Sequence, residues 1–145
     1  MLHEFSRTEL LLGKEALEIL KNSKVAIFGV GGVGSFVAEG LVRAGVGNFV
    51  LVDDDLVCTT NINRQIHATS KTVGKPKAEV MKERILEINP KAKVEVHKKF
   101  YLPECAEELI KDDYDYIVDA VDTVTAKIDL AVQAKKRNIP IISSM

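Results

Sequence analysis

The stretch that decides the fold of this 145-residue chain is Val25–Gly34, with the sequence VAIFGVGGVG. Its first four residues form an uninterrupted apolar run, which is typical of a strand buried on both faces of a parallel sheet. The next six follow the pattern G-x-G-x-x-G, whose glycines allow a tight turn, the close approach of a phosphate and close packing of strand against helix. A helix that begins at Gly34 would present free N–H groups to an anion. The stretch therefore predicts a phosphate-binding strand–turn–helix unit.

Apolar runs and helical patterns alternate along the rest of the chain. Further strands are expected at Phe49–Val52, Val94–Val96, Tyr116–Val118 and from Ile139 onward. Helices are expected from the glycine turn to about Arg43, from Pro76 to Asn89, from Pro103 to Lys111 and from Thr125 to Arg137. This alternation predicts an α/β fold, namely a Rossmann-like, doubly wound, mostly parallel sheet with helices on both faces.

Residues 1–23 are predicted to form an N-terminal arm and helix, because apolar residues recur at roughly helical spacing between Thr8 and Lys21. Residues 24–145 then form the nucleotide-binding domain. The final segment Ile139–Met145 reads as a buried strand with no cap, turn or closing helix after it. We therefore expect this domain to be the truncated part of a larger enzyme.

The charge balance, 20 Lys plus Arg against 21 Asp plus Glu, excludes a uniformly basic nucleic-acid binder and a disordered acidic chain. The apolar run Leu10–Leu12 is too short for a signal-peptide core, so we expect a cytoplasmic protein with no membrane segment. Cys58 and Cys105 lack zinc-site spacing, and we predict a buried structural thiol at the first and a core residue at the second. His67 is predicted to be packed or hydrogen-bonded rather than a metal ligand.

An acidic residue follows the second expected strand at the position where nucleotide-binding folds hold a ribose. Asp53 lies 19 residues after Gly34, close to the ~20 expected for this carboxylate. Asp54 and Asp55 have the character of turn residues at a strand end. On these features alone the leading interpretation is an NAD-dependent dehydrogenase, with a merely structural glycine turn as the alternative.

Further motifs follow in order along the chain: Gly31–Ser35, Ala44–Gly47, Val57–His67, Val73–Ala78 and Asp119–Asp122. Together they resemble the ThiF/MoeB/HesA family of adenylating enzymes, relatives of ubiquitin-activating enzymes. The resemblance extends from about Arg7 to Ser144. It implies an ATP-dependent enzyme that adenylates a carboxylate.

The resemblance also implies roles for individual residues. ATP would lie on the glycine turn, at Gly29, Gly31, Gly32 and Gly34, with its ribose on Asp53 and with Asp55 as a further acid near the site. Asn61, Arg64 and Lys77 would contact phosphates, and Asp122 would hold Mg²⁺. Arg7 resembles the arginine that one subunit of a homodimer lends to its neighbour. Without the resemblance, Arg64 and Lys77 would be read as solvated cations and Asp122 as a helix cap.

The segment Asn61–Ala68, preceded by Val57-Cys58, most resembles the branch of the family that acts on N6-threonylcarbamoyladenosine in tRNA. This implies adenylation of that carboxylate followed by cyclising dehydration. Residues 64–99 hold ten Lys plus Arg and four Glu, a distribution that suits RNA phosphates or a solvated helix face equally.

Two other functions stay open at this point. One is adenylation of the C-terminus of a ubiquitin-like sulfur-carrier protein of the thiamine or molybdopterin type, which would bring a sulfur-transfer partner. The other is an NAD-binding oxidoreductase. Cys58 as a thioester nucleophile is an alternative to its structural role, but no base is paired with it in the sequence.

Overall fold

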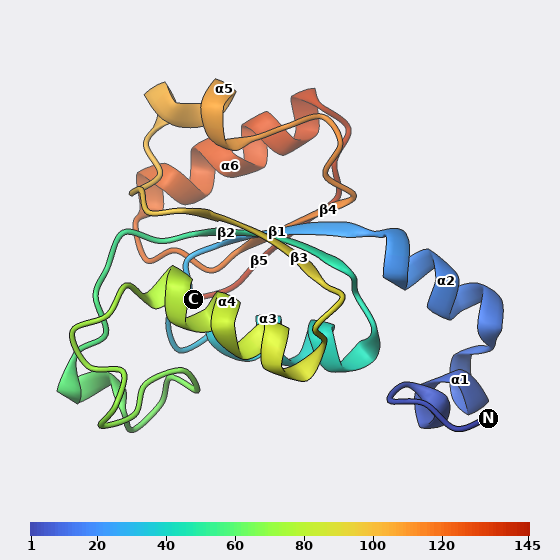
Figure 1. The fold of residues 1–145 in the computed structure, drawn as a ribbon. Coiled ribbons are helices and arrows are strands. Elements are labelled where there is room, and N and C mark those ends of the chain that lie inside the picture. Colours follow the sequence, from blue (N-terminus) through green and yellow to red (C-terminus); the bar gives the residue numbers. More distant parts are fainter.

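The computed structural model describes residues 1–145 and consists of one sheet between two layers of helices (Figure 1). The strands are β1 (Lys24–Phe28), β2 (Asn48–Val52), β3 (Lys93–His97), β4 (Tyr116–Asp119) and β5 (Ile141–Ser143). Their order is β3-β2-β1-β4-β5, and every neighbouring pair is parallel. The predicted doubly wound parallel sheet is therefore confirmed.

Helices cover both faces of this sheet. The pair α3 (Gly34–Ala44) and α4 (Lys77–Ile88) lies on one face, and α5 (Ala106–Leu109) with α6 (Val124–Lys136) on the other (Figure 1). The remaining elements are α1 (Ser6–Leu12), α2 (Lys14–Asn22) and the short 3-10 turns η1 (Thr59–Asn61) and η2 (Pro103–Cys105). No helix has the length and apolar character needed to span a membrane.

The central strand shows why the apolar run of the glycine stretch forms a buried strand. Val25 and Ile27 pack into the core shared with α3 and α4, whereas Ala26 and Phe28 pack into the core shared with α5 and α6. Successive side chains of a strand point to opposite faces, so a strand covered on both sides must be apolar at every position.

The predicted helix ends are confirmed where turn residues mark them. Gly45 follows α3 in the left-handed region, with φ 109°, and its N–H reaches back to the carbonyls of Leu41 and Val42. Pro76 immediately precedes α4, and Asn89 follows it in an extended conformation. Gly45 can adopt the left-handed conformation because it has no Cβ, and Pro76 cannot donate a hydrogen bond inside a helix. Asn89 is extended because the residue before a proline, here Pro90, disfavours the helical conformation.

The N-terminal arm differs from the expected single helix. It is split into α1 and α2 by Gly13, whose φ of 87° cannot continue a right-handed helix. Neither helix buries a residue completely, and Leu10 and Leu11 are 83% and 84% exposed. Leu20 of α2 packs against the core of the sheet, whereas Leu10 and Leu11 of α1 are covered by nothing in this chain.

The last strand is also different from the prediction. β5 lies at the edge of the sheet and not in its interior, and the side chain of Ile142 is 56% exposed. An apolar triplet has the same sequence character in a central strand as in an edge strand, because the sequence does not say how many neighbours the strand has.

Two glycines bring the elements around β1 into backbone contact. A Cβ atom at Gly34 would lie 1.7 Å from the carbonyl oxygen of Gly29. A Cβ at Gly29, where φ is 92°, would lie 2.5 Å from the carbonyl oxygen of Ala120. The turn, the start of α3 and the loop after β4 therefore meet with no side chain between them.

We predict that Gly34→Ala lowers the free energy of unfolding by about 1–3 kcal/mol, the usual range for forcing an extra carbon into a packed site. The matched control is Gly40→Ala on the same helix, where an added Cβ meets nothing within 4 Å. This control should stabilise the helix by about 1 kcal/mol because alanine is the better helix former. Urea denaturation measures both changes. Equal changes in the free energy of unfolding at the two glycines would contradict the close contact between Gly34 and the carbonyl of Gly29.

Candidate nucleotide-binding site

The largest cavity lies at the point where the sheet changes direction. The chain leaves β1 toward β2 on one side, and β4 lies on the other, so a crevice opens beyond the carboxyl ends of these strands. A cavity of about 640 Å³ occupies this edge. The predicted site residues that line it are Gly29, Gly31, Gly32, Asp53, Asp55, Asn61, Arg64, Lys77 and Asp122. The fold thus brings together residues that lie up to 93 positions apart in the sequence.

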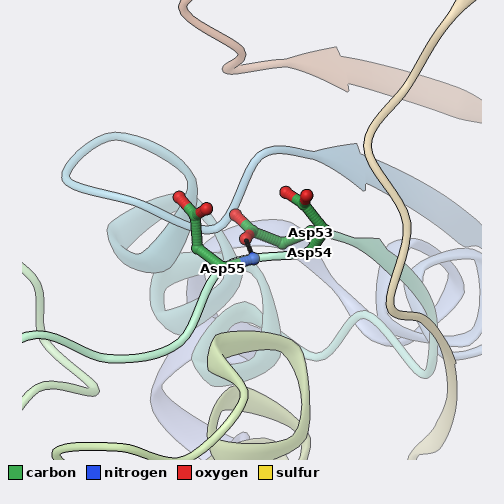
Figure 2. Close-up of side chains that lie close together, drawn as sticks. All are labelled: Asp53, Asp54 and Asp55. Carbon is green, nitrogen blue, oxygen red and sulfur yellow. Dashed lines mark hydrogen bonds between the residues drawn. The ribbon is translucent and has the colours of Figure 1, made fainter.

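Asp53 is held by the glycine turn. Its Oδ2 accepts a hydrogen bond from the N–H of Val30 over 2.7 Å. Its Oδ1 accepts one from the N–H of Asp55 over 2.8 Å (Figure 2). Burial raises the pKa of Asp53, and these two N–H groups act in the opposite direction. A carboxylate has about four lone-pair sites, so Asp53 keeps acceptor capacity for a hydroxyl in the cavity.

Three carboxylates gather at the end of β2. Those of Asp53, Asp54 and Asp55 have oxygen atoms within 4.8 Å of one another (Figure 2). Asp54 and Asp55 are exposed, which is consistent with the turn character expected of them. Asp122, in the loop after β4, lines the same cavity. This part of the cavity is therefore rich in oxygen ligands.

Lys77 is the cation that the fold places most firmly. It begins α4 and is only 6% exposed, so the alternative of a solvated surface lysine is wrong. Its Nζ lies 3.6 Å from Oδ2 of the exposed Asp55. An ion pair with an exposed partner at this distance is weak, and Lys77 is therefore available to an anion in the cavity.

Arg64 and Asn61 come from the turn η1 and the residues after it. Asn61 is buried, and its Oδ1 accepts the N–H of Cys58 over 2.8 Å. Arg64 is exposed and donates from Nη1 to the carbonyl of Thr60 and to Oδ1 of Asn63. Because both acceptors lie within four residues of Arg64, the local chain holds the guanidinium of this cavity-lining residue.

Asp122 does not cap the helix that follows it. The residue preceding α6 is Thr123, and no side chain caps that helix. Asp122 is exposed and accepts no hydrogen bond within the chain. The capping alternative is wrong, and because the carboxylate has no partner in the chain, the loop backbone alone determines where this side chain begins.

Two predicted residues are not part of the cavity lining. Gly34 lies behind the turn, where its lack of a side chain permits the contact with Gly29. Arg7 lies on α1, which precedes the amino end of β1 on the side of the sheet away from the carboxyl ends (Figure 1). The Arg7 of one copy therefore cannot complete the cavity of that same copy.

Sequence reasoning missed several lining residues. Gln65 follows Arg64 directly and is buried with its Oε1 unpartnered, so its place beside a predicted ligand was the available signal. Lys99, Phe100 and Tyr101 follow β3, and no sequence pattern marks them. Tyr101 packs edge-to-face on Phe28, and its hydroxyl donates to Asp129 over 2.5 Å.

The prediction of a buried thiol at Cys58 is wrong. Cys58 is exposed, because it precedes η1 and its backbone is satisfied by Asn61 while its side chain points outward. The hydroxyl of Thr60 donates to its Sγ over 3.3 Å and lowers the pKa of the thiol. Cys105 is partly buried and packs against the core on the α6 side of the sheet, as expected.

His67 is packed and hydrogen-bonded, as predicted. It is 2% exposed, and its Nε2 lies 2.7 Å from the carbonyl oxygen of Val30, in the glycine turn. A carbonyl only accepts, so Nε2 carries the proton and the buried Nδ1 is left without a partner. Burial lowers the pKa of His67, which keeps the ring neutral.

The class of protein follows from three features together. A glycine turn ends one strand, an acid follows the next strand, and a cavity lies where the strand order reverses. These features define an α/β nucleotide-binding domain. The particular family follows from the whole chain. Residues 5–145 match the ThiF family, and the chain belongs to this family.

Several members of known name are similar to the chain. The tRNA threonylcarbamoyladenosine dehydratase of Bacillus subtilis is 56% identical over 145 residues, which are all of this chain and 57% of that protein. The Escherichia coli enzyme of that name, solved in complex with ATP, superposes with a TM-score of 0.94 at 41% identity, over 97% of this chain and 58% of that one. A sulfur carrier protein adenylyltransferase of Thermus thermophilus is 40% identical over 111 residues, 77% of this chain and 41% of that protein. The chain spans about half the length of the curated relatives it matches.

The neutral state of His67 makes stability depend on pH. Its pKa is lower in the folded state than the ~6.5 of an unfolded chain, so below that value the unfolded state binds more protons. Stability contributed by the neutral ring is therefore complete above pH ~6.5 and is lost as the pH falls toward the lower folded pKa. We predict that His67→Gln, which still offers a donor to Val30, removes this part of the pH dependence.

Urea denaturation between pH 7.5 and 5.5 tests the expectation. The difference in free energy of unfolding between wild type and His67→Gln should shrink as the pH is lowered. His97→Gln is the matched control, since this histidine lies at the sheet edge. Parallel curves for wild type and His67→Gln would contradict the assignment of a buried neutral ring.

Proposed function

We propose that this protein binds ATP in the cavity at the switch point and adenylates the carboxylate of N6-threonylcarbamoyladenosine in tRNA, which then cyclises with loss of water. The observation that carries the proposal is the convergence of Asp53, Asn61, Arg64, Lys77 and Asp122 on one cavity beside the glycine turn. The 56% identity to a tRNA threonylcarbamoyladenosine dehydratase supports the choice of substrate.

The charges around the cavity suit an attack on the α-phosphate of ATP. A carboxylate substrate is ionised at neutral pH and needs no general base. Negative charge then develops on phosphate oxygens and on the pyrophosphate that leaves, and fixed cations stabilise it. In this proposal Lys77 and Arg64 supply those cations, Asn61 contacts phosphate, and the start of α3 supplies N–H groups.

The residues present also fit a magnesium ion. Mg²⁺ is held in proteins by one or two carboxylates together with substrate phosphates and water. Asp122 is an exposed carboxylate free of protein partners that faces the cavity, and the acids at the end of β2 lie in the same cavity. We propose that Asp122 holds the ion, which neutralises phosphate charge when bound.

A homodimer would explain two features that one copy leaves open. Arg7 is exposed and remote from its own cavity, and the apolar residues Leu10 and Leu11 beside it are uncovered. We propose that these leucines pack against a second copy and that Arg7 reaches the partner's cavity. Contiguous exposed apolar residues are typical of such an interface.

Residues 64–99, the segment rich in Lys and Arg, have fewer unpaired cations for RNA phosphates than their composition suggests. Four of the ten cations are already paired with acids of the chain, namely Lys77, Arg84, Lys98 and Lys99. The remaining cations are available to tRNA phosphates. Of the six remaining cations only Arg64 lines the cavity, so the proposed tRNA interface draws most of its unpaired cations from outside the cavity lining.

The sulfur carrier protein adenylyltransferase among the relatives supports a second candidate, adenylation of the C-terminus of a small ubiquitin-like protein. The chemistry up to the acyl-adenylate is the same in both functions. The acceptor of that adenylate distinguishes them.

We predict that the protein, given ATP, Mg²⁺ and tRNA that contains threonylcarbamoyladenosine, releases pyrophosphate and yields a nucleoside lighter by one water. Mass spectrometry of the digested tRNA measures this product. Asp122→Ala should lower the rate by about 10²–10³-fold with the fold intact, the usual effect of losing one group that stabilises developing charge.

Glu83→Ala is the matched control, because Glu83 is an exposed acid on α4 and does not line the cavity. Pyrophosphate release with a sulfur-carrier protein in place of tRNA would favour the second candidate. Near-normal turnover by Asp122→Ala would show that this acid has another role.

The dimer predicts complementation between inactive variants. In a mixture of Arg7→Ala and Asp122→Ala subunits, about half of the dimers are mixed, and each holds one site with no substitution. About a quarter of the wild-type rate should therefore return. A mixture of Lys77→Ala and Asp122→Ala is the control, since both substitutions act within their own copy and no intact site forms. Equal rates in the two mixtures would contradict the transfer of Arg7.

A further inference from the structure

A buried ion pair lies behind the loop that carries Asp122. Lys127, in the first turns of α6, places its Nζ 3.1 Å from Oδ1 of Asp119, at the end of β4. The side chain of Asp119 is fully buried and that of Lys127 is 15% exposed. Neither residue lines the cavity. An effect of the pair on the site therefore has to pass through the backbone between the two residues.

The ammonium group of Lys127 connects three segments of backbone. Besides Asp119 it donates to the carbonyl of Val121 over 3.0 Å and to the carbonyl of Ser144 over 2.8 Å. All three donors of the ammonium group are thus used inside the chain. Val121 is the residue immediately before Asp122, so this hydrogen bond fixes the peptide from which the Asp122 side chain extends.

Other contacts hold the same loop from its remaining sides. Oδ1 of Asp119 also accepts the N–H of Val121 over 3.2 Å, and the carbonyl of Asp119 accepts the N–H of Ser144 over 2.9 Å. The N–H of Ala120 donates to the carbonyl of Phe28 over 2.8 Å, next to the glycine turn. Lys127 is the one cationic side chain in this set of contacts, and it donates to Val121 in the loop and to the neighbouring Ser144.

We propose that Lys127 is a positioning residue that holds the loop 120–123 so that Asp122 faces the cavity. The proposal rests on the function proposed above, in which Asp122 acts on the phosphates of ATP. Asp122 has no side-chain partner of its own, so its position depends on the loop backbone. The buried Asp119 serves to place the ammonium group and to balance its charge.

Replacing Lys127 alone would not separate a loss of stability from a loss of positioning, because its partner Asp119 is charged and buried. Lys127→Met leaves the buried carboxylate of Asp119 without a cation, which destabilises the fold whatever the role of the lysine. Lys127→Met combined with Asp119→Asn removes both charges and restores a neutral interior. This double variant separates folding from positioning, because it lacks the ammonium donor to Val121 but contains no unpaired charge.

Four variants in the full chain test the proposal: Lys127→Met, the double variant, Lys127→Arg, and Lys135→Met as a matched control in the last turn of the same helix. ATP–pyrophosphate exchange measures the rate of adenylation, and calorimetry measures the affinity for AMP. Thermal unfolding measures the stability, and hydrogen exchange measures the protection of residues 120–123. The double variant should unfold near the wild-type temperature, yet lose about 10–100-fold in rate, the usual effect of removing a group that orients a metal ligand.

AMP binding, which needs the glycine turn and Asp53, should change by less than about twofold, and exchange protection of the loop should fall. Lys127→Arg should recover part of the rate, and Lys135→Met should behave as wild type. A double variant that regains both stability and rate would show that the pair is only structural and overturn the proposal. If the wild-type protein binds no nucleotide, the proposed function fails, whereas loop protection in the same variants still shows whether Lys127 fixes the loop.

Discussion

The rest of the structure depends on the close approach of backbone at the glycine turn. A side chain at Gly34 would overlap the carbonyl of Gly29, and one at Gly29 would overlap the carbonyl of Ala120. Because nothing stands between them, β1, α3 and the loop after β4 meet at one point. The glycine turn at this point lines the cavity, and the start of a helix beside it is a place that suits phosphate.

The charged side chains around the cavity differ in how strongly contacts within the chain fix their positions. Asp53 is fixed by two N–H groups, and Lys77 is buried but paired only with an exposed acid. Asp122 has no side-chain contact and depends on the loop that Lys127 holds from behind. The carboxylate proposed to bind the ribose is thus positioned before any ligand arrives, whereas the groups proposed to bind phosphate and Mg²⁺ are held by weaker contacts or by none.

The sequence predicted the sheet, its direction and most helix ends, because these follow from local patterns: apolar runs of strand length, glycine and proline at helix ends, and the glycine turn. It did not predict the break at Gly13, since the apolar spacing continues across it. Exposure was the weaker part of the prediction. Cys58 and Ile142 were expected inside and lie outside, and Lys77 has a surface character but lies inside.

For the site, the sequence by itself determined which residue types follow each strand, and the motif spacing singled out Asp53, Asn61, Arg64, Lys77 and Asp122 as a set. Only the tertiary structure decided that these residues share one cavity while Arg7 stands apart from it. It also revealed Gln65 and Tyr101 in the lining, and Lys127 behind it. The physical reason is that a parallel sheet collects the carboxyl ends of distant strands at one edge, and which side chains meet there depends on strand order and packing, which no local pattern encodes.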